Sequence, residues 1–195
     1  MEREKILNEI LAVEWEMFHA VPNEGGTADC QQQPNAFRLM RKVAYKPLSA
    51  AFLTAWYAAL CSAQADGRNL MTEKYAFMDS RAVPAADGAD PHIAAILDAE
   101  CRWRAAVHDE FPHMVQKDDG FFRRYLAGEM HTYTPAALAA YADCVHTALA
   151  EGRNMVRERY EFLAEQLGYA SLAACEQETM HQQQAPVSGC NAGRA

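Results

Sequence analysis

Apolar side chains recur every three or four positions along most of this chain, which is the period of an α-helix packed on one face. Between residues 2 and 20 the apolar positions are 6, 7, 10, 11, 13, 17 and 18, and residues 92–110 show similar spacing. Short segments rich in Pro, Gly, Asn and Asp separate these stretches and predict loops. The pattern predicts helices over residues 2–20, 35–43, 49–79, 92–110, 121–127, 134–167 and 171–180, with a disordered tail over residues 181–195.

The two longest predicted helices begin at good capping residues, Ser49 and Thr134, but each contains an interior glycine. Asp66-Gly67 is also a turn signal, so the first of these helices could end there. Apolar residues on both sides of Gly67 nevertheless keep one helical phase, which favours a continuous helix in which Gly67 lets another helix approach closely. We therefore predict unbroken helices, with a break at Gly67 and Gly152 as the alternative.

A long polar segment occurs twice in the chain. DGRNLMTEKYAFM at residues 66–78 returns as EGRNMVRERYEFL at residues 151–163, an offset of 85 residues that also brings Trp56 onto Tyr141. Each unit would have one apolar face per helix and could not bury that face alone. We predict an all-α, internally duplicated, pseudo-twofold bundle that forms one domain over residues 1–180, with repeat units at 2–79 and 92–168 and a linker at 80–91.

Composition narrows the classes of partner. The 195 residues include 18 Lys and Arg against 26 Asp and Glu, a net charge of −8, which argues against a nucleic-acid surface. No apolar run approaches the roughly 20 residues of a membrane span, and the charged N-terminus is unlike a signal peptide. The six cysteines show no metal-ligand spacing, so we expect a cytoplasmic protein in which they are packing residues.

Four charged residues fall on the apolar faces of the predicted helices. Glu14 and Glu100 lie in the middle of such faces, and Lys74 and Arg159 do the same on the long helices. An unpaired buried charge costs several kcal/mol, so we expect the two acids to meet the two bases inside the bundle. Such pairs can be purely structural and fix helix register, or they can line a ligand cavity.

Carboxylates at four equivalent places raise a third interpretation. Asn69 with Glu73, and Asn154 with Glu158, are spaced for hydrogen bonds along a helix surface. Together with Glu14 and Glu100, these Glu residues would give a di-metal site with the weak candidate ligands Glu14, Glu73, Glu100 and Glu158. Ferritin-like sites place a His three residues after two of their Glu ligands, and this chain has none there, so we favour no metal.

The loop that follows the first predicted helix contains Cys30 in the sequence NEGGTADCQ. A thiol there could be exposed, and the backbone amides of such a loop could hold an anion. The alternative is a cysteine that packs under the bundle. His19 and His131 are candidate partners for the thiol, but nothing in the spacing pairs either of them with it.

Five segments together resemble a known family: NEGGTADCQ, FRLMR, GRNLMTEKY, YLAGEMHTY and LGYASL. They are similar to the bacterial family called domain of unknown function 4125, and the resemblance covers about residues 3–178. It implies that the family's motifs include Asn23, Gly26, Cys30, Gln31, Arg41, Arg68, Asn69, Glu73, Lys74, Tyr75, Glu129 and Tyr133. The family also occurs beside or fused to nucleotidyltransferase-like domains, which implies an accessory role with such a partner.

From these motif positions we expect one asymmetric site, because the second copy lacks the loop with paired glycines and Cys30. The expected function is binding of a small polar or anionic ligand, and the sequence identifies no cofactor and leaves catalysis open. The alternative is a protein-interaction module whose buried charges are structural. The expected ligand-binding residues are Glu14, Asn23, Gln31, Arg41, Arg68, Asn69, Glu73, Lys74, Tyr75, Glu129 and Tyr133, and the catalytic candidates are Glu73 as a general base, Lys74 as a stabilising cation and Cys30 as a nucleophile.

Overall fold

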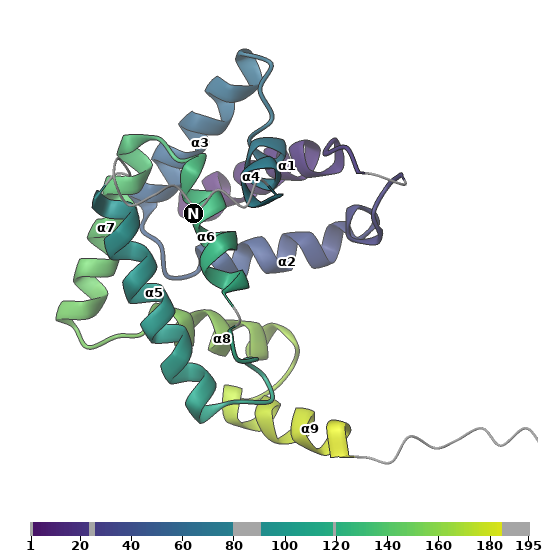
Figure 1. Cartoon of the computed structure of the whole chain (residues 1–195), viewed down its shortest axis with the longest axis vertical. Coiled ribbons are helices and arrows are strands. Elements are labelled where there is room, and N and C mark those ends of the chain that lie inside the picture. The colour runs from purple at the N-terminus through teal and green to yellow at the C-terminus, as the bar shows by residue number, and fades with distance from the viewer. Residues whose placement is uncertain (1, 24–25, 80–90, 119, 185–195) are drawn as a thin grey trace, which may run out of the picture.

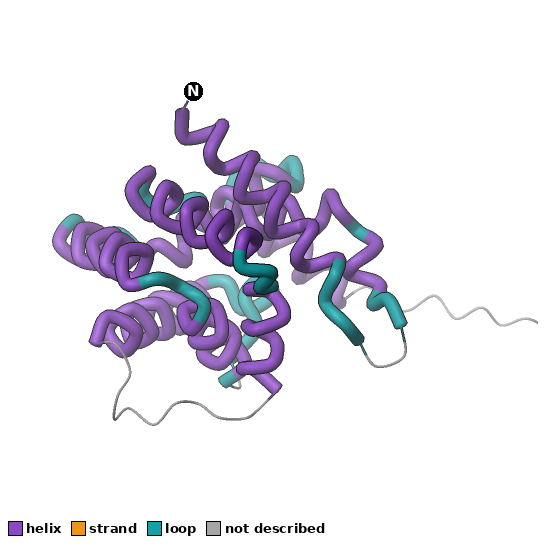
Figure 2. Tube along the Cα trace, turned by 90° about the horizontal axis from the view of Figure 1, so that it is seen from above, coloured by secondary structure: helices purple, strands orange, loops and turns teal. Residues whose placement is uncertain are grey.

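The computed structural model describes residues 2–23, 26–79, 91–118 and 120–184, and all regular elements in these ranges are helical (Figures 1 and 2). This confirms the predicted all-α class. The elements are α1 (Glu2–His19), η1 (Asp29–Gln32), α2 (Pro34–Tyr45), α3 (Ala50–Ala65), α4 (Leu70–Asp79), α5 (Pro91–Glu110), α6 (Phe121–His131), α7 (Pro135–Ala150), α8 (Met155–Gln166) and α9 (Leu172–Gln184).

The ends of the described ranges bear on two predicted segments. Apart from Pro91, which begins α5, the predicted linker lies outside the described residues. Helix α9 continues through residues 181–184, the first four residues of the predicted tail, and the remainder of that tail is also outside the described ranges.

The prediction of two unbroken long helices is wrong. Helix α3 ends at Ala65 and α7 at Ala150, and the following Gly67 and Gly152 have left-handed backbones with φ of 70° and 67°. The amide of residue 68 donates to the carbonyl of residue 63 at 2.8 Å, and that of 153 donates to 148 at the same distance. This is the Schellman ending, which turns the chain and satisfies the last carbonyls of the helix. No atom lies within 4 Å of where a Cβ of Gly67 would be, so Gly67 does not serve close helix packing.

The asparagine after each turn starts the next helix and ties it to a neighbour. Asn69 Oδ1 accepts the amide of the third following residue at 3.0 Å, and its Nδ2 donates to the Met17 carbonyl at 2.8 Å. Asn154 makes the same two bonds, at 2.9 Å and, to the Trp103 carbonyl, at 3.1 Å. Each asparagine therefore caps one helix and holds the C-terminal part of another.

An arginine–glutamate ion pair lies beside each of these two turns. Nε and Nη2 of Arg68 donate hydrogen bonds to the two carboxylate oxygens of Glu73 at 2.9 and 2.6 Å. The same two atoms of Arg153 donate to the carboxylate of Glu158 at 2.7 and 2.9 Å. The recurring Gly-Arg-Asn…Glu sequence is thus explained by a turn, a cap and a bidentate ion pair, rather than by the predicted hydrogen bond between Asn and Glu.

Helix contacts in the two halves follow the same plan (Figure 1). Helix α1 packs on α2, α3 and α4, and α5 packs on α6, α7 and α8. The halves meet where α3 packs on α7, and each half sends its fourth helix across, α4 onto α6 and α8 onto α2. The internal duplication stays a prediction, and this correspondence of contacts is the observation that supports it.

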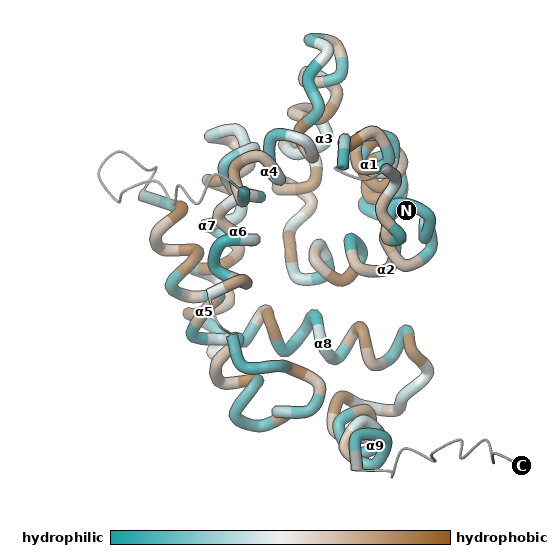
Figure 3. The backbone as a smooth tube through the Cα atoms, turned by 45° about the vertical axis from the view of Figure 1, so that its right-hand side comes forward, coloured by the Kyte–Doolittle hydropathy of each residue, from teal (hydrophilic) through white to brown (hydrophobic). Residues whose placement is uncertain are grey.

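The N-caps and apolar helix faces predicted from the sequence are present in the structure. Ser49 Oγ accepts the amide of Phe52 at 3.2 Å, and the Thr134 hydroxyl accepts the amide of Ala137 at 3.3 Å, as expected of N-caps. Apolar residues alternate with polar ones along the tube in Figure 3, and the apolar ones form one continuous core. Its largest fully buried side chains include Trp56, Tyr45, Phe52, Ile10, Leu11 and Leu53.

Candidate functional site

A network of four buried charges lies where α1, α2, α4 and α6 meet. Glu14 on α1 is fully buried, and Arg41 on α2 donates Nε to its Oε2 at 2.9 Å and Nη2 to its Oε1 at 2.7 Å. The indole Nε1 of Trp56 donates to the same Oε1 at 2.9 Å, and the Tyr45 hydroxyl also donates to it. Glu14 is therefore held by three donor side chains from two other helices.

Glu129 on α6 connects the other two charges of this network. Its Oε1 lies 2.5 Å from Nη2 of Arg41, and its Oε2 accepts from Nζ of Lys74 at 2.8 Å. The Tyr133 hydroxyl is 3.4 Å from Oε1, and Nζ of Lys74 lies 3.6 Å from the centre of the Tyr125 ring. Two carboxylates and two cations thus balance one another, and we call Glu14, Arg41, Lys74 and Glu129 the charge tetrad.

Mutual attraction keeps the tetrad ionised in spite of burial. Burial opposes the charge of Glu129, but Arg41 and Lys74 outweigh it and hold the pKa of that carboxyl well below its usual range. Burial likewise opposes the charge of Lys74, and the Glu129 carboxylate more than offsets it and raises the pKa. Burial raises the pKa of the Tyr45 and Tyr133 hydroxyls. A carboxylate this acidic is a poor general base at neutral pH, so the tetrad is better suited to holding helices than to moving protons.

A smaller cluster occupies the equivalent place in the second half. Arg159 donates Nη1 and Nη2 to Glu100 at 2.6 and 2.9 Å, and the Tyr141 hydroxyl donates to the same carboxylate at 2.8 Å. Nε of Arg159 donates to the Ala44 carbonyl on α2 at 3.1 Å. The predicted meeting of Glu100 with Arg159 is confirmed.

The prediction that Glu14 pairs with Lys74 or Arg159, within or across the copies, is wrong, since Glu14 pairs with Arg41 and Lys74 pairs with Glu129. Both of these partners had been predicted as ligand-binding residues from the family resemblance, and helical periodicity alone did not single them out. The structure brings Glu14, Arg41, Lys74, Glu129 and Tyr133 together, and their contact with a ligand stays a prediction.

The remaining expected ligand-binding residues lie outside the tetrad. Arg68 and Glu73 form their ion pair on the surface, with side-chain exposures of 55% and 36%, and Asn69 caps α4. Glu73, the candidate base, and Lys74, the candidate cation, are thus each engaged by a different ion-pair partner. Their predicted roles stay untested predictions.

Hydrogen bonds of the Gln31 side chain hold the loop after α1 in place. Its Nε2 donates to the carbonyls of Phe18 and Val21 at 2.8 and 2.9 Å, and its Oε1 accepts from Nδ2 of Asn23 at 2.6 Å and from the amide of Ala28 at 2.9 Å. The buried amide therefore satisfies the carbonyls at the end of α1. Residues 24–25 of this loop are not among those described.

Cys30, the neighbour of Gln31, is exposed, and this agrees with one of the two interpretations of the sequence. It lines a pocket of about 240 Å³ together with Tyr75, Asp79 and the loop residues. The residues that line this pocket include neither Glu73 nor Lys74, so the three catalytic candidates do not share one cavity.

The di-metal interpretation finds no site in the described part of the chain. Each of its four carboxylates has an arginine of its own: Arg41 for Glu14, Arg68 for Glu73, Arg159 for Glu100 and Arg153 for Glu158. Within the described ranges, no three His, Cys, Asp or Glu residues lie close enough together to hold a metal ion.

A different pocket, of about 260 Å³, lies between α2 and α8, and we call it the α2–α8 pocket. Three guanidinium groups line it, those of Arg41, Arg104 and Arg159, and its lining includes no Asp or Glu. Arg41 and Arg159 are already held by the buried carboxylates described above. An adjoining pocket of about 490 Å³ shares four lining residues with it, Arg104, Phe122, Tyr125 and Tyr160.

Arg104 differs from the other two arginines in its partners. Nη2 donates to the Gln116 carbonyl at 2.9 Å and Nη1 to the Tyr160 hydroxyl at 3.3 Å, and the guanidinium lies 5.2 Å from the centre of the Phe122 ring. Its Nε is buried and has no hydrogen-bond partner among the described residues. No carboxylate in the described ranges forms an ion pair with Arg104, although Asp118, together with Lys117, lines the adjoining pocket. Sequence reasoning missed this residue.

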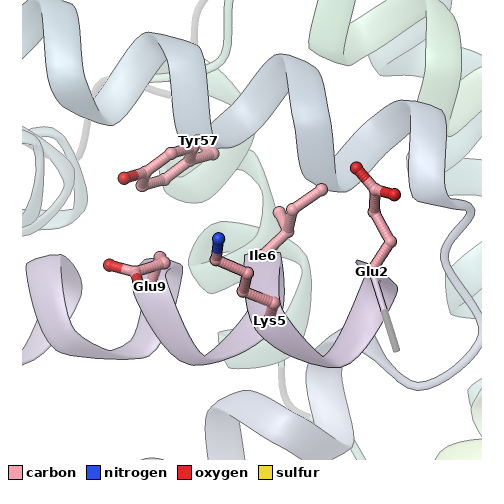
Figure 4. A pocket seen from close by; sticks show the side chains of 5 residues that line it. All are labelled: Glu2, Lys5, Ile6, Glu9 and Tyr57. Carbon is pink, nitrogen blue, oxygen red and sulfur yellow. The ribbon is translucent and has the colours of Figure 1, made fainter.

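A larger pocket, of about 680 Å³, lies on the outside of the bundle between α1 and α3 (Figure 4). Tyr57 on α3 lies across from Glu2, Lys5, Ile6 and Glu9 on α1, and in the view it is on the side of Glu9, with Glu2 at the other end. Its charged groups are of both signs and on the surface, where solvent screens them, so it is a weaker candidate than the α2–α8 pocket.

Comparison with known protein families adds the identity of the chain. Residues 4–177 match the family described as "Protein of unknown function (DUF4125)". The chain belongs to the DUF4125 family. This confirms the resemblance noted from the sequence motifs. Searches of the curated proteins and of the solved structures give no match to this DUF4125 chain. Within its described ranges, none of the helices combines the length and apolar character of a membrane span.

Proposed function

We propose that this DUF4125 protein binds a small molecule through an anionic group, which Arg104 receives in the α2–α8 pocket. The observation that carries the proposal is that Arg104, which has no carboxylate partner in the described ranges, lines a pocket that no Asp or Glu lines. A partly buried cation without a counter-charge is costly, and a charge-assisted hydrogen bond that the guanidinium donates to an anion would reduce that cost.

The proposal keeps the class of ligand expected from the sequence but changes the binding group. Lys74 was the expected cation, but Glu129 already matches its charge at 2.8 Å. Arg41 and Arg159 are in the same position, since each is held by its own carboxylate. Arg41 and Arg159, each held by its carboxylates, then form fixed parts of the pocket wall, and Arg104 is the group free to bind.

The first half of the chain supports this assignment, because it has Phe18 where the second half has Arg104. The two positions are 86 residues apart, the same offset that relates Glu14 to Glu100. Phe18 stacks on Phe37 with ring centres 4.9 Å apart, whereas Arg104 lies over the equivalent Phe122. A phenylalanine would therefore fit this place in the fold, and the arginine is better explained by binding than by packing.

The experiment is a titration of the purified protein with sodium acetate and with sodium phosphate at constant ionic strength, followed by amide NMR shifts and by thermal unfolding. We expect saturable shifts at residues of α2, α6 and α8 in the wild type. Arg104→Phe, which copies the first half, should fold and lose them. Arg102→Gln is the matched control, because Arg102 is an exposed arginine on the same helix whose bond goes to the Asp98 carbonyl. Equal binding by wild type and Arg104→Phe would overturn the proposal.

The second candidate function is the interaction module, and the balanced charge tetrad is the observation that favours it. Every cation of the tetrad has a carboxylate partner, as expected of struts that fix helix register. Association with a nucleotidyltransferase-like domain would belong to this function. It is the better explanation if neither acetate nor phosphate binds at Arg104, while such a domain, purified separately, binds the chain in a titration.

A further inference from the structure

We infer that the ligand is an amphipathic monoanion, a molecule with one carboxylate-like group and an apolar body of about the size of a medium-length alkyl chain. This inference rests on the proposed anion binding at Arg104 and adds the chemistry of the remainder of the ligand. It follows from what lines the α2–α8 pocket, from the number of free charges there, and from the pocket's size.

The walls of the α2–α8 pocket are apolar away from the arginines. Met40, Val43 and Ala44 face it from α2, and Val156 and Leu163 face it from α8. Met40 is 54% exposed, so this large apolar side chain stands at the surface beside the pocket. Burying apolar surface of a ligand here would be favourable, whereas a sugar or another polar body would lose hydrogen bonds to water without replacing them.

The number of free charges favours a single negative charge on the ligand. Of the three guanidinium groups in the lining, two are neutralised by Glu14, Glu129 and Glu100, which leaves Arg104. A carboxylate would match this one positive charge. A phosphate monoester dianion would leave one negative charge uncompensated beside apolar walls, which is costly.

The volume of the pocket sets the length of the apolar body. About 260 Å³ holds roughly nine atoms, at the ~30 Å³ that a water molecule takes up in the liquid. Arg104 also lines the adjoining pocket of about 490 Å³, so it stands at the junction of the two. A carboxylate bound at this junction would direct a chain of about eight carbons between α2 and α8.

A chain-length series tests the inference. The probes are the sodium salts of acetate, butyrate, hexanoate, octanoate and dodecanoate, titrated into the full chain, with inorganic phosphate for comparison. Each buried methylene should tighten binding about fourfold, so the dissociation constant should fall steeply from butyrate to octanoate and level off beyond it. Leu163→Trp, which fills the pocket from a partly exposed position, should abolish this dependence on chain length, whereas Arg102→Gln, outside the pocket, should retain it.

The outcomes separate this inference from the proposed function. If acetate and octanoate bind wild type equally and Arg104→Phe binds neither, the anion site stands and the amphipathic ligand is refuted. Tighter binding of phosphate than of octanoate would also refute it. If octanoate binds Arg104→Phe as tightly as wild type, or if no probe binds at all, the proposed function falls and the inference falls with it.

Discussion

The contact of α4 with α6 and the contact of α2 with α8 occupy equivalent places in the two halves, but side chains fill them differently. At the first, a Cβ on Gly128 would lie 2.9 Å from Cγ of Met78 and 3.3 Å from the carbonyl oxygen of Lys74, so the helices touch through the glycine. At the second, the residue at the predicted offset is Val43, and a pocket of about 260 Å³ lies between the helices. One interface is closed and the other is open.

The α4–α6 and α2–α8 interfaces also differ in how their charges are balanced. At the closed interface, the tetrad balances two acids against two bases. At the open interface, Glu100 balances Arg159, but Arg104 has no ion-pair partner among the described residues. The difference teaches that one helical frame can hold a structural network on one side and a candidate binding site on the other, with few substitutions between them.

Breaking the tetrad should produce the largest effect. Glu129→Gln leaves Arg41 and Lys74 with one carboxylate between them in a buried place, and removing one partner of a buried ion pair costs about 3–5 kcal/mol. The measurement is the free energy of unfolding in urea. Glu73→Gln is the control, because its ion pair with Arg68 lies on the surface, where solvent screens it and its contribution to stability is small. Equal losses in the two variants would refute the structural role of the tetrad.

Acid should weaken the closed interface through the same carboxylate. Arg41 and Lys74 hold the pKa of Glu129 below its unfolded value of about 4.3, so its contribution is complete above that pH and is lost as the pH falls below it. Its share of the loss should approach about 1.4 kcal/mol per pH unit in this window. Urea unfolding at pH 6, 4 and 3 measures it. A Glu129→Gln variant with as steep a pH dependence as the wild type would contradict the assignment.

Gly128→Ala tests the close approach of α4 and α6. The added methyl would overlap Met78 and the backbone of Lys74, and overpacking of this kind costs about 1–3 kcal/mol. Urea unfolding again gives the value. Helix propensity alone would make the alanine about 1 kcal/mol more stable, so a gain would show that the helices are not in contact there.

The two turns should respond alike, because this feature is shared by both halves. Gly67→Ala and Gly152→Ala each place a side chain on a left-handed backbone with open space around it, at a cost of about 1–2 kcal/mol. Thermal unfolding of the two variants should give similar shifts. A large effect at one glycine and none at the other would argue against equivalent corners.

Much of this architecture could be predicted from the sequence, because helical period and capping residues act locally. The all-α class, the N-caps Ser49 and Thr134, and the burial of Glu14 and Glu100 all followed from such signals. The continuous helix through Gly67 did not hold. Apolar residues eleven apart, such as Leu60 and Met71, keep one helical phase even when the chain turns between them, so periodicity could not detect the break.

The site was harder to predict, because it depends on which helices meet. Arg41 pairs with Glu14 from a helix of 12 residues, and Glu129 acts from one of 11, too short for periodicity to fix a buried face. The sequence nevertheless contains a signal for Arg104. Comparing the halves at an offset of 86 residues places an arginine opposite Phe18, and a charge in place of a buried aromatic residue is informative.

The crossing of α4 onto α6 and of α8 onto α2 has a consequence for folding. Lys74 depends on a carboxylate that the chain supplies 55 residues later, and Arg159 bonds to a carbonyl 115 residues earlier. In each half, a buried charge has its partner in the other half, so neither half should remain folded as a separate fragment. Two separately produced halves, each unfolded alone, would be expected to fold when mixed, and the intact chain should unfold in one cooperative step.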